Sequence, residues 1–147
     1  MLKRDSKGFT LIELLIVVAI IGIIAAIAIP NRLNAIDRGK QKRTMADMRS
    51  IGTAIESYAV DNNVYPIATT SAVLSTLVSP VYIKTMPQMD GWAHTFQVTA
   101  ATTDYTVYSQ GKDGTGTTCT AATTTTFNDE ICFVNGQFQR YPAGTQQ

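Results

Sequence analysis

The side chains that could bind a metal or perform covalent chemistry are few in this 147-residue chain. It contains two cysteines, Cys119 and Cys132, and a single histidine, His94. A structural zinc site would have to combine these three side chains with a carboxylate, and no short-spaced Cys or His pair is present, which argues against zinc. No sequence pattern pairs a nucleophile with a base. An enzyme is therefore not predicted.

The two cysteines have a structural alternative. A disulfide between Cys119 and Cys132 would close a loop of roughly 14 residues and stabilise the fold by about 3 kcal/mol in the chain-entropy model. Disulfides persist in oxidising compartments. The pair therefore favours a location outside the cytoplasm.

Glu13 is the most unusual carboxylate, because it lies inside a long apolar block. From Phe9 to Ile29 the chain has 21 residues, of which only Thr10 and Glu13 are polar. A helix of that length spans about 31 Å, which matches the apolar core of a bilayer. An ionised carboxylate in such a span costs about 2.5 to 3.5 kcal/mol on insertion scales. The Glu13 side chain is therefore expected to have a partner.

This apolar block has two other interpretations. A buried core helix fits poorly, because residues 14–29 are apolar all round rather than along one stripe. A secretory signal peptide fits better, since Ala26 and Ala28 form an A-x-A cleavage signature behind a basic start. Cleavage there would release a soluble protein beginning near Ile29. Two features argue against a signal peptide. The block exceeds the usual 7 to 15 apolar residues, and a signal peptide does not require a charged residue such as Glu13 inside its apolar region.

A cut after Gly8 would give that charge a partner. The new amino terminus on Phe9 would lie four residues before Glu13, so an amine and a carboxylate could pair within one helix. The amine of one copy could equally meet Glu13 of the next copy, which would relieve a buried charge through assembly. The membrane anchor would then also be a polymerisation device.

Residues 7–15, which read KGFTLIELL, carry a family resemblance together with the following apolar run, Gly22 and Pro30. They resemble the prepilin signature of type IV pilins and of the pseudopilins of type II secretion. The resemblance implies a subunit that assembles into a homo-oligomeric filament through its long hydrophobic helix. In such a subunit Glu13 is the assembly carboxylate, and Gly22 and Pro30 are points where the helix bends or loosens.

The same resemblance implies processing and a set of partners. A prepilin peptidase would remove residues 1–8 as a leader and methylate Phe9, so that Gly8 and Phe9 form the processing site. Residues 9–30 would hold the subunit in the inner membrane as a single span before assembly. An inner-membrane assembly platform would then move it into a filament in the periplasm or at the cell surface.

The basic residues near the apolar block point to the opposite orientation. Three Lys or Arg residues precede the block and six follow it, so the positive-inside rule alone would place the carboxyl-terminal part in the cytoplasm. We expect that part to lie in the periplasm nevertheless. The two cysteines favour an oxidising compartment, and the resemblance implies a cytoplasmic leader.

The rest of the chain divides into a helix and a head. Residues 31–62 are predicted to continue as an amphipathic helix with a kink or melted turn near Pro30, because apolar residues recur at helical spacing. These are Met48, Ile51, Ile55 and Tyr58. Residues 63–147 are predicted to form a globular α+β head, in which the long helix packs on a small antiparallel sheet.

The head is predicted to contain one short helix and four strands. The helix covers residues 71–78 and is capped by Ser71. The strands cover residues 95–99, 105–109, 131–134 and 137–141. The Thr-rich stretch 115–126 has little to bury and is predicted to be an exposed loop.

The head also resembles the body of the major pseudopilin of type II secretion, over roughly three quarters of the chain in all. The matching residues include 54–58, Gly91-Trp92 and 109–114. That relative holds a calcium ion in its final loop, and the corresponding acids here are Asp113, Asp129 and Glu130. Calcium takes six to eight oxygen ligands, so main-chain carbonyls would have to complete the set.

Charge along the chain agrees with assembly between copies. Residues 32–49 contain six basic and two acidic side chains, a net of +4, whereas residues 50–147 contain three basic and seven acidic side chains, a net of −4. This complementarity suits packing between copies better than binding to nucleic acid, which is not predicted. The sequence predicts a structural filament subunit of a pseudopilus. The alternatives are a surface pilin for adhesion, motility or DNA uptake, and a secreted or anchored binding module that never polymerises.

Overall fold

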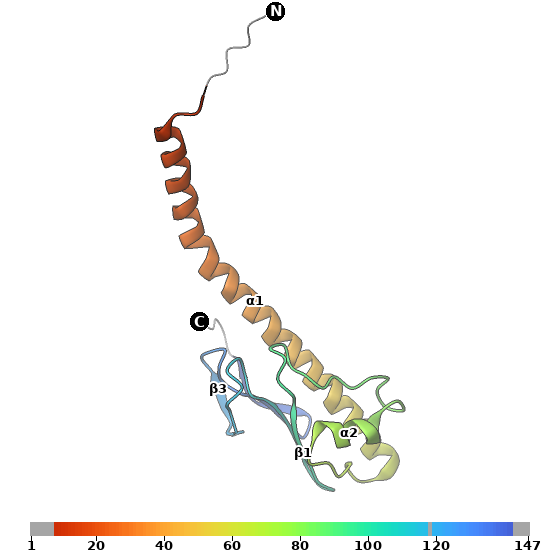
Figure 1. The fold of residues 1–147 in the computed structure, drawn as a ribbon. Helices are drawn as coiled ribbons and strands as arrows, with labels where there is room; N and C mark the ends of the chain where they lie inside the picture. Colours follow the sequence, from red (N-terminus) through yellow and green to blue (C-terminus); the bar gives the residue numbers. More distant parts are fainter. Residues whose placement is uncertain (1–7, 118, 143–147) are drawn as a thin grey trace, which may run out of the picture. The chain divides into compact units, whose positions relative to one another are not determined.

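The computed structural model describes residues 8–117 and 119–142. By its internal contacts the chain divides into two compact units, one extending to Ile36 and one beginning at Asp37. The first unit is helical from Leu11 onward, and the second contains the sheet (Figure 1). The α+β class is confirmed.

Helix α1 (Leu11–Asn62) is 52 residues long and contains Pro30. It is unbroken at Gly22 and at Pro30, so the predicted melted turn is not present. Proline removes one main-chain donor, but the residues on both sides of Pro30 stay helical. The helix ends where Asn63 adopts a positive φ of 58°, a left-handed conformation that asparagine tolerates and that commonly terminates helices.

Helix α2 (Ser71–Val78) has the predicted bounds but a different cap. Its N-cap is Thr70, whose side-chain oxygen accepts a hydrogen bond from the amide of Val73. Ser71 is the first helical residue and is buried. The prediction that Ser71 caps the helix is wrong by one residue, because either hydroxyl can cap and only the local backbone decides between them.

The sheet has five strands in the order β1-β2-β4-β5-β3. The strands are β1 (Gln97–Ala100), β2 (Tyr105–Ser109), β3 (Ala122–Thr124), β4 (Ile131–Val134) and β5 (Gln137–Pro142). Neighbouring strands are antiparallel except for β3, which runs parallel to β5. The sheet is therefore mixed, and the prediction of a purely antiparallel sheet is wrong at this edge.

Strand β3 also corrects the prediction for the Thr-rich stretch. Ala122, Thr123 and Thr124 pair with β5, and the Thr124 side chain is only 2% exposed. Threonine is β-branched and fits a pleated edge strand despite its polarity. The stretch is therefore partly a strand rather than wholly an exposed loop.

The core of the second unit lies between α1 and the sheet. Met48, Ile51 and Ile55 are fully buried, which confirms the predicted inward face of the helix. They belong to one apolar cluster with side chains of the sheet, including Val98, Tyr105, Val107 and Ile131. Gly52 allows close approach, because a Cβ there would lie 2.3 Å from the Phe133 ring.

Candidate processing and assembly site

The start of α1 presents the predicted processing position to solvent. Gly8 and Phe9 precede the helix, and the Phe9 side chain is 82% exposed. Apart from its chain neighbours, no atom of the described residues lies within 4 Å of the place where a Cβ on Gly8 would stand. The bond between these residues is therefore sterically open in the subunit as described.

Glu13 takes part in a capping box with Thr10. The Glu13 carboxylate accepts hydrogen bonds from the amide of Thr10 at 2.9 Å and from its hydroxyl at 2.7 Å, both through Oε2. In return, the hydroxyl of Thr10 accepts a 3.3 Å bond from the amide of Glu13. This reciprocal pattern satisfies donors that a helix N-terminus leaves unpaired. Our sequence reasoning missed it, although Thr-x-x-Glu before an apolar run is its signature.

The capping box gives Glu13 a local partner within one subunit. Its carboxylate lies at the N-terminus of α1, where the helix dipole also favours negative charge. That is the end of the helix at which an amine on Phe9 would stand after processing. The pairing of such an amine with Glu13 stays a prediction.

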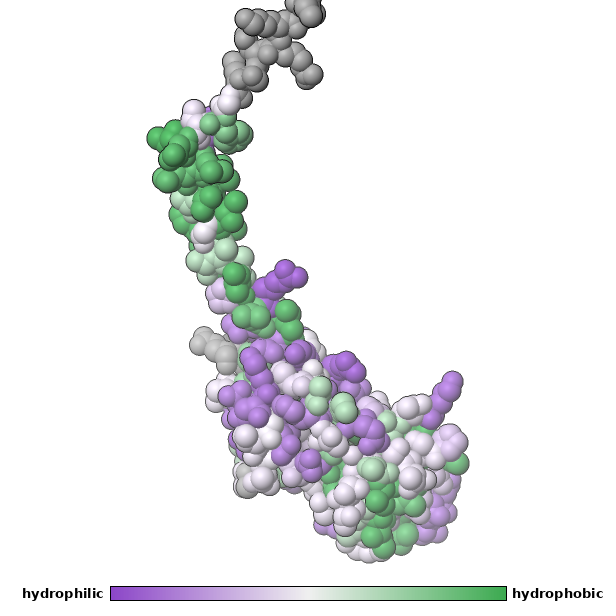
Figure 2. Space-filling model, viewed as in Figure 1, coloured by the Kyte–Doolittle hydropathy of each residue, from purple (hydrophilic) through white to green (hydrophobic). Residues whose placement is uncertain are grey.

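The next five turns of α1 expose an apolar surface. An 18-residue window of this helix has a mean hydropathy of 3.1 and none of it is buried, so by length and composition it could cross a membrane. Figure 2 shows this segment as a mostly green column with a few pale patches. Its exposed large side chains include Leu11, Leu14, Leu15, Ile20, Ile24 and Ile29. A buried core helix is therefore excluded for this segment within the described structure.

At the start of the second unit, Asp37 connects α1 to two loops of the head. Its Oδ1 accepts a 3.1 Å bond from the Trp92 indole, and its Oδ2 accepts a 2.8 Å bond from the Lys112 ammonium. Burial opposes ionisation of Asp37, but these two bonds and the Lys112 charge outweigh it and lower the pKa of the carboxyl. Sequence reasoning did not find this cluster.

A second polar cluster surrounds Asp90, which is 4% exposed. It accepts bonds from the amides of Trp92 and His94 at 2.9 Å and from the Ser109 hydroxyl at 2.6 Å. The His94 ring lies 2.9 Å from the carbonyl oxygen of Gly111. Ser109 is fully buried, so it is not accessible as a nucleophile, and His94 has a structural position.

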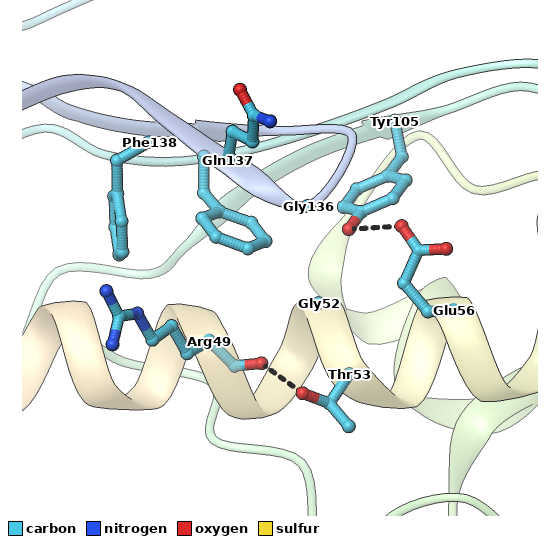
Figure 3. Close-up of a pocket in the computed structure, with 9 residues that line it drawn as sticks. Arg49, Gly52, Thr53, Glu56, Tyr105, Gly136, Gln137 and Phe138 are labelled. Atoms are coloured by element: carbon cyan, nitrogen blue, oxygen red, sulfur yellow. Dashed lines mark hydrogen bonds between the residues drawn. The ribbon is translucent and has the colours of Figure 1, made fainter.

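An open groove of about 610 Å³ lies between α1 and the β4–β5 hairpin (Figure 3). The Tyr105 hydroxyl donates a 3.0 Å bond to Glu56 across it, and the Arg49 guanidinium lies 5.3 Å from the centre of the Phe138 ring. Burial, with the adjacent Glu56 carboxylate, raises the pKa of Tyr105. The bond from Tyr105 to Glu56 joins the sheet to the helix, which indicates that the groove residues have a structural role.

The final loop contains the predicted disulfide and the predicted calcium ligands. Cys119 and Cys132 form a disulfide, as predicted. Asp129 and Glu130 come together, but they meet on Arg140. Asp113 lies in its own turn, where its carboxylate accepts a bond from the amide of Thr115.

These acids as placed do not fit a calcium ion. Within residues 8–117 and 119–142, no group of three His, Cys, Asp or Glu side chains is positioned to hold a metal. Glu130 lies 2.7 Å from the Arg140 guanidinium, and a guanidinium is a competing cation at the place where calcium would have to bind.

Two protein families match the chain over adjoining stretches. A prokaryotic N-terminal methylation motif matches residues 3–29. The family described as type II secretion system protein G matches residues 31–126. The two matches adjoin at Pro30.

Individual relatives agree with that assignment. The type II secretion system core protein G of Aeromonas hydrophila is 32% identical over 129 residues, which cover 78% of this chain and 88% of the relative. That of Vibrio cholerae is 33% identical over 125 residues, covering 76% and 84%. The type IV major fimbrial protein FimA of Dichelobacter nodosus is 55% identical over 60 residues, covering 41% and 38%. With an exposed apolar helix, a capped Glu13 and a family match over residues 31–126, the chain belongs to the protein G family of type II secretion, the major pseudopilins.

Proposed function

We propose that this chain is the repeating structural subunit of the pseudopilus of a type II secretion system. The observation that supports this most directly is the exposed apolar part of α1, which precedes in the sequence the residues that match the protein G family. Apolar side chains exposed on this scale are costly in water, at about 25 cal/mol per Å². In a subunit that moves from the membrane into a filament, lipid and then neighbouring helices would cover them.

The proposal has two chemical steps before assembly. A prepilin peptidase hydrolyses the peptide bond after Gly8, which leaves a carboxylate on Gly8 and a free amine on Phe9. It then transfers a methyl group to that amine from a sulfonium donor, which leaves as a thioether. The amine of an incoming subunit meets Glu13 in the filament, so two charges are paired where water is excluded. An inner-membrane platform receives the subunit with its head in the periplasm. The disulfide between Cys119 and Cys132 supports that orientation, because it requires an oxidising compartment.

The processing step is tested by the intact mass of the protein from cells with an active prepilin peptidase. We expect a chain of 139 residues beginning at Phe9, eight residues shorter than the 147 of the full sequence and carrying an N-methyl group. Gly8→Leu is the matched variant, and it should stay uncut because a bulky side chain occupies the position before the cleaved bond. An uncut wild-type chain, or a mature terminus near Ile29, would contradict the proposal.

A surface type IV pilin is the second candidate, and the likeness to the Dichelobacter nodosus fimbrial protein favours it. That likeness covers only 41% of this chain, whereas the likeness to the protein G relatives of Aeromonas hydrophila and Vibrio cholerae covers 78% and 76%. Images of filaments made at native expression levels would separate the two. Long surface fibres would support a pilin, and filaments confined to the envelope would support a pseudopilus.

A further inference from the structure

Strand β5 contains an arginine, Arg140, on the half-buried face of the sheet. Side chains of β5 alternate between exposed and half-buried positions, and Arg140 lies on the same face as Phe138. The Arg140 side chain is 18% exposed. An arginine held in such a place requires a charged partner, since burying an unpaired guanidinium is costly.

Arg140 has two such partners. One guanidinium nitrogen, Nη1, lies 2.7 Å from Oε2 of Glu130, whose side chain is 13% exposed. The other, Nη2, lies 3.7 Å from Oδ1 of Asp129, whose side chain is 26% exposed. The planar fork of arginine suits two acceptors on one side. Arg140 therefore bridges two consecutive acids.

The second oxygen of Asp129 is satisfied by main-chain donors. Its Oδ2 accepts bonds from the amides of Thr125 at 2.7 Å and Thr126 at 2.9 Å. Burial opposes the charge on Asp129, but these amides and the Arg140 charge outweigh it and lower the pKa of the carboxyl. One guanidinium and two amides together stabilise the two negative charges.

The loop is also shaped around this cluster. A Cβ on Gly116 would lie 2.0 Å from Cγ of Glu130, so glycine is required for the loop to cover that side chain. Arg140 is paired across the sheet with Cys132 of β4 and with Ala122 of β3. The disulfide links Cys119 to Cys132, which lies in β4. The ion cluster and the disulfide therefore close the same segment.

We infer that the Arg140 guanidinium neutralises Asp129 and Glu130 and so holds the end of the preceding loop against the sheet. A bound divalent metal would otherwise have to supply this positive charge. A calcium ion would need six to eight oxygen ligands at 2.3 to 2.6 Å. At this place it would meet the positive charge of Arg140 on the same two acids. The folded head therefore does not depend on calcium. This inference is independent of the proposed place of the chain in a pseudopilus.

The test compares thermal unfolding of the full chain in detergent, with the disulfide intact, in 1 mM calcium chloride and in 1 mM EGTA. We expect the wild-type Tm to be the same in both solutions. Arg140→Gln should lower the Tm by about 5 to 10 °C, because it leaves two acids without their cation. Arg140→Lys should lose less, since it keeps the charge.

Arg43→Gln is the matched control, because Arg43 pairs with Asp47 at 3.5 Å and its side chain is 72% exposed. Its Tm should move by less than about 2 °C. If Arg140→Gln lowers the Tm no more than Arg43→Gln does, the inference is wrong. A wild-type Tm that rises in calcium would also overturn it.

A second variant keeps the inference testable if Arg140→Gln does not fold. Glu130→Gln removes the charge of the acid nearer to Arg140, and it should lower the Tm by a few degrees. The Tm of this variant should be the same in calcium chloride and in EGTA. Where both single variants fold, the double variant should lose less than the sum of the two, because the Glu130 carboxylate and the Arg140 guanidinium are then removed together and neither is left without the other. Strictly additive losses would show that the two groups do not act together and would refute the inference.

Discussion

The two units of this chain use the same helix in opposite ways. In the first, residues such as Leu11 and Ile20 are apolar and exposed, by 81% and 51%. In the second, Met48 and Ile51 of the same helix are fully buried against the sheet. Helix formation is thus independent of where the apolar surface goes. Stability of the first unit must come from surroundings outside one subunit, whereas the second contains its own core.

The largest effect should follow from removing the charge in the first unit. Glu13→Ala should still insert in the membrane, and more readily, because a span without a carboxylate is less costly. Filament yield should fall to background, since the incoming amine of Phe9 has no partner. Sheared filaments quantified by immunoblotting provide the measurement. Asp61→Ala, an exposed acid at the end of α1, is the control and should assemble normally. Normal assembly of the Glu13 variant would remove the proposed role of that carboxylate.

A core truncation should separate the units most clearly. Ile51→Ala should lower the free energy of unfolding of the head by about 2 to 5 kcal/mol, because it leaves a cavity between α1 and the sheet. Ile20→Ala, at an exposed position of the first unit, should not change it. Denaturant titration in detergent, followed by the fluorescence of Trp92, measures both. Equal losses would mean that the first unit contributes to the stability of the head.

The cluster around Asp37 should make the stability of the second unit depend on pH. The pKa of Asp37 is lowered in the folded state, so its contribution is complete above the ordinary value of about 3.9 and is lost as pH falls through the folded pKa. Asp37→Asn should destabilise the head at pH 7, and the gap from wild type should narrow below about pH 4. Asp104→Asn, in an exposed turn, is the control. A gap that stays constant with pH would contradict this role.

The smallest effect should come from the capping box. Thr10→Ala removes one hydroxyl and should cost the start of α1 about 1 kcal/mol. Amide hydrogen exchange of the first helical turn should quicken accordingly. Thr53→Ala is the control, because the Thr53 hydroxyl bonds to the carbonyl of Arg49 inside the helix. Faster exchange in both variants alike would show that the cap is not the cause.

Sequence reasoning succeeded where the signal is local and periodic. The apolar block, the inward face at Met48, Ile51 and Ile55, and the bounds of α2 follow from spacing alone, because a helix repeats every 3.6 residues whatever it packs against. The cysteine pair was also predicted correctly. In a chain with two cysteines there is one intramolecular pairing, so no folded structure is needed to choose it.

Tertiary structure decided the features that depend on distant residues. The parallel pairing of β3 with β5 and the burial of Thr124 depend on which edge of the sheet is open, and the Thr-rich sequence carries no signal for it. Asp37 with Lys112, and Arg140 with Glu130, join residues on separate elements, so only the folded chain determines that each acid has a cation nearby. An acid that binds calcium and an acid that pairs with an arginine look the same in a sequence, and only the folded chain shows that Arg140 lies beside Glu130.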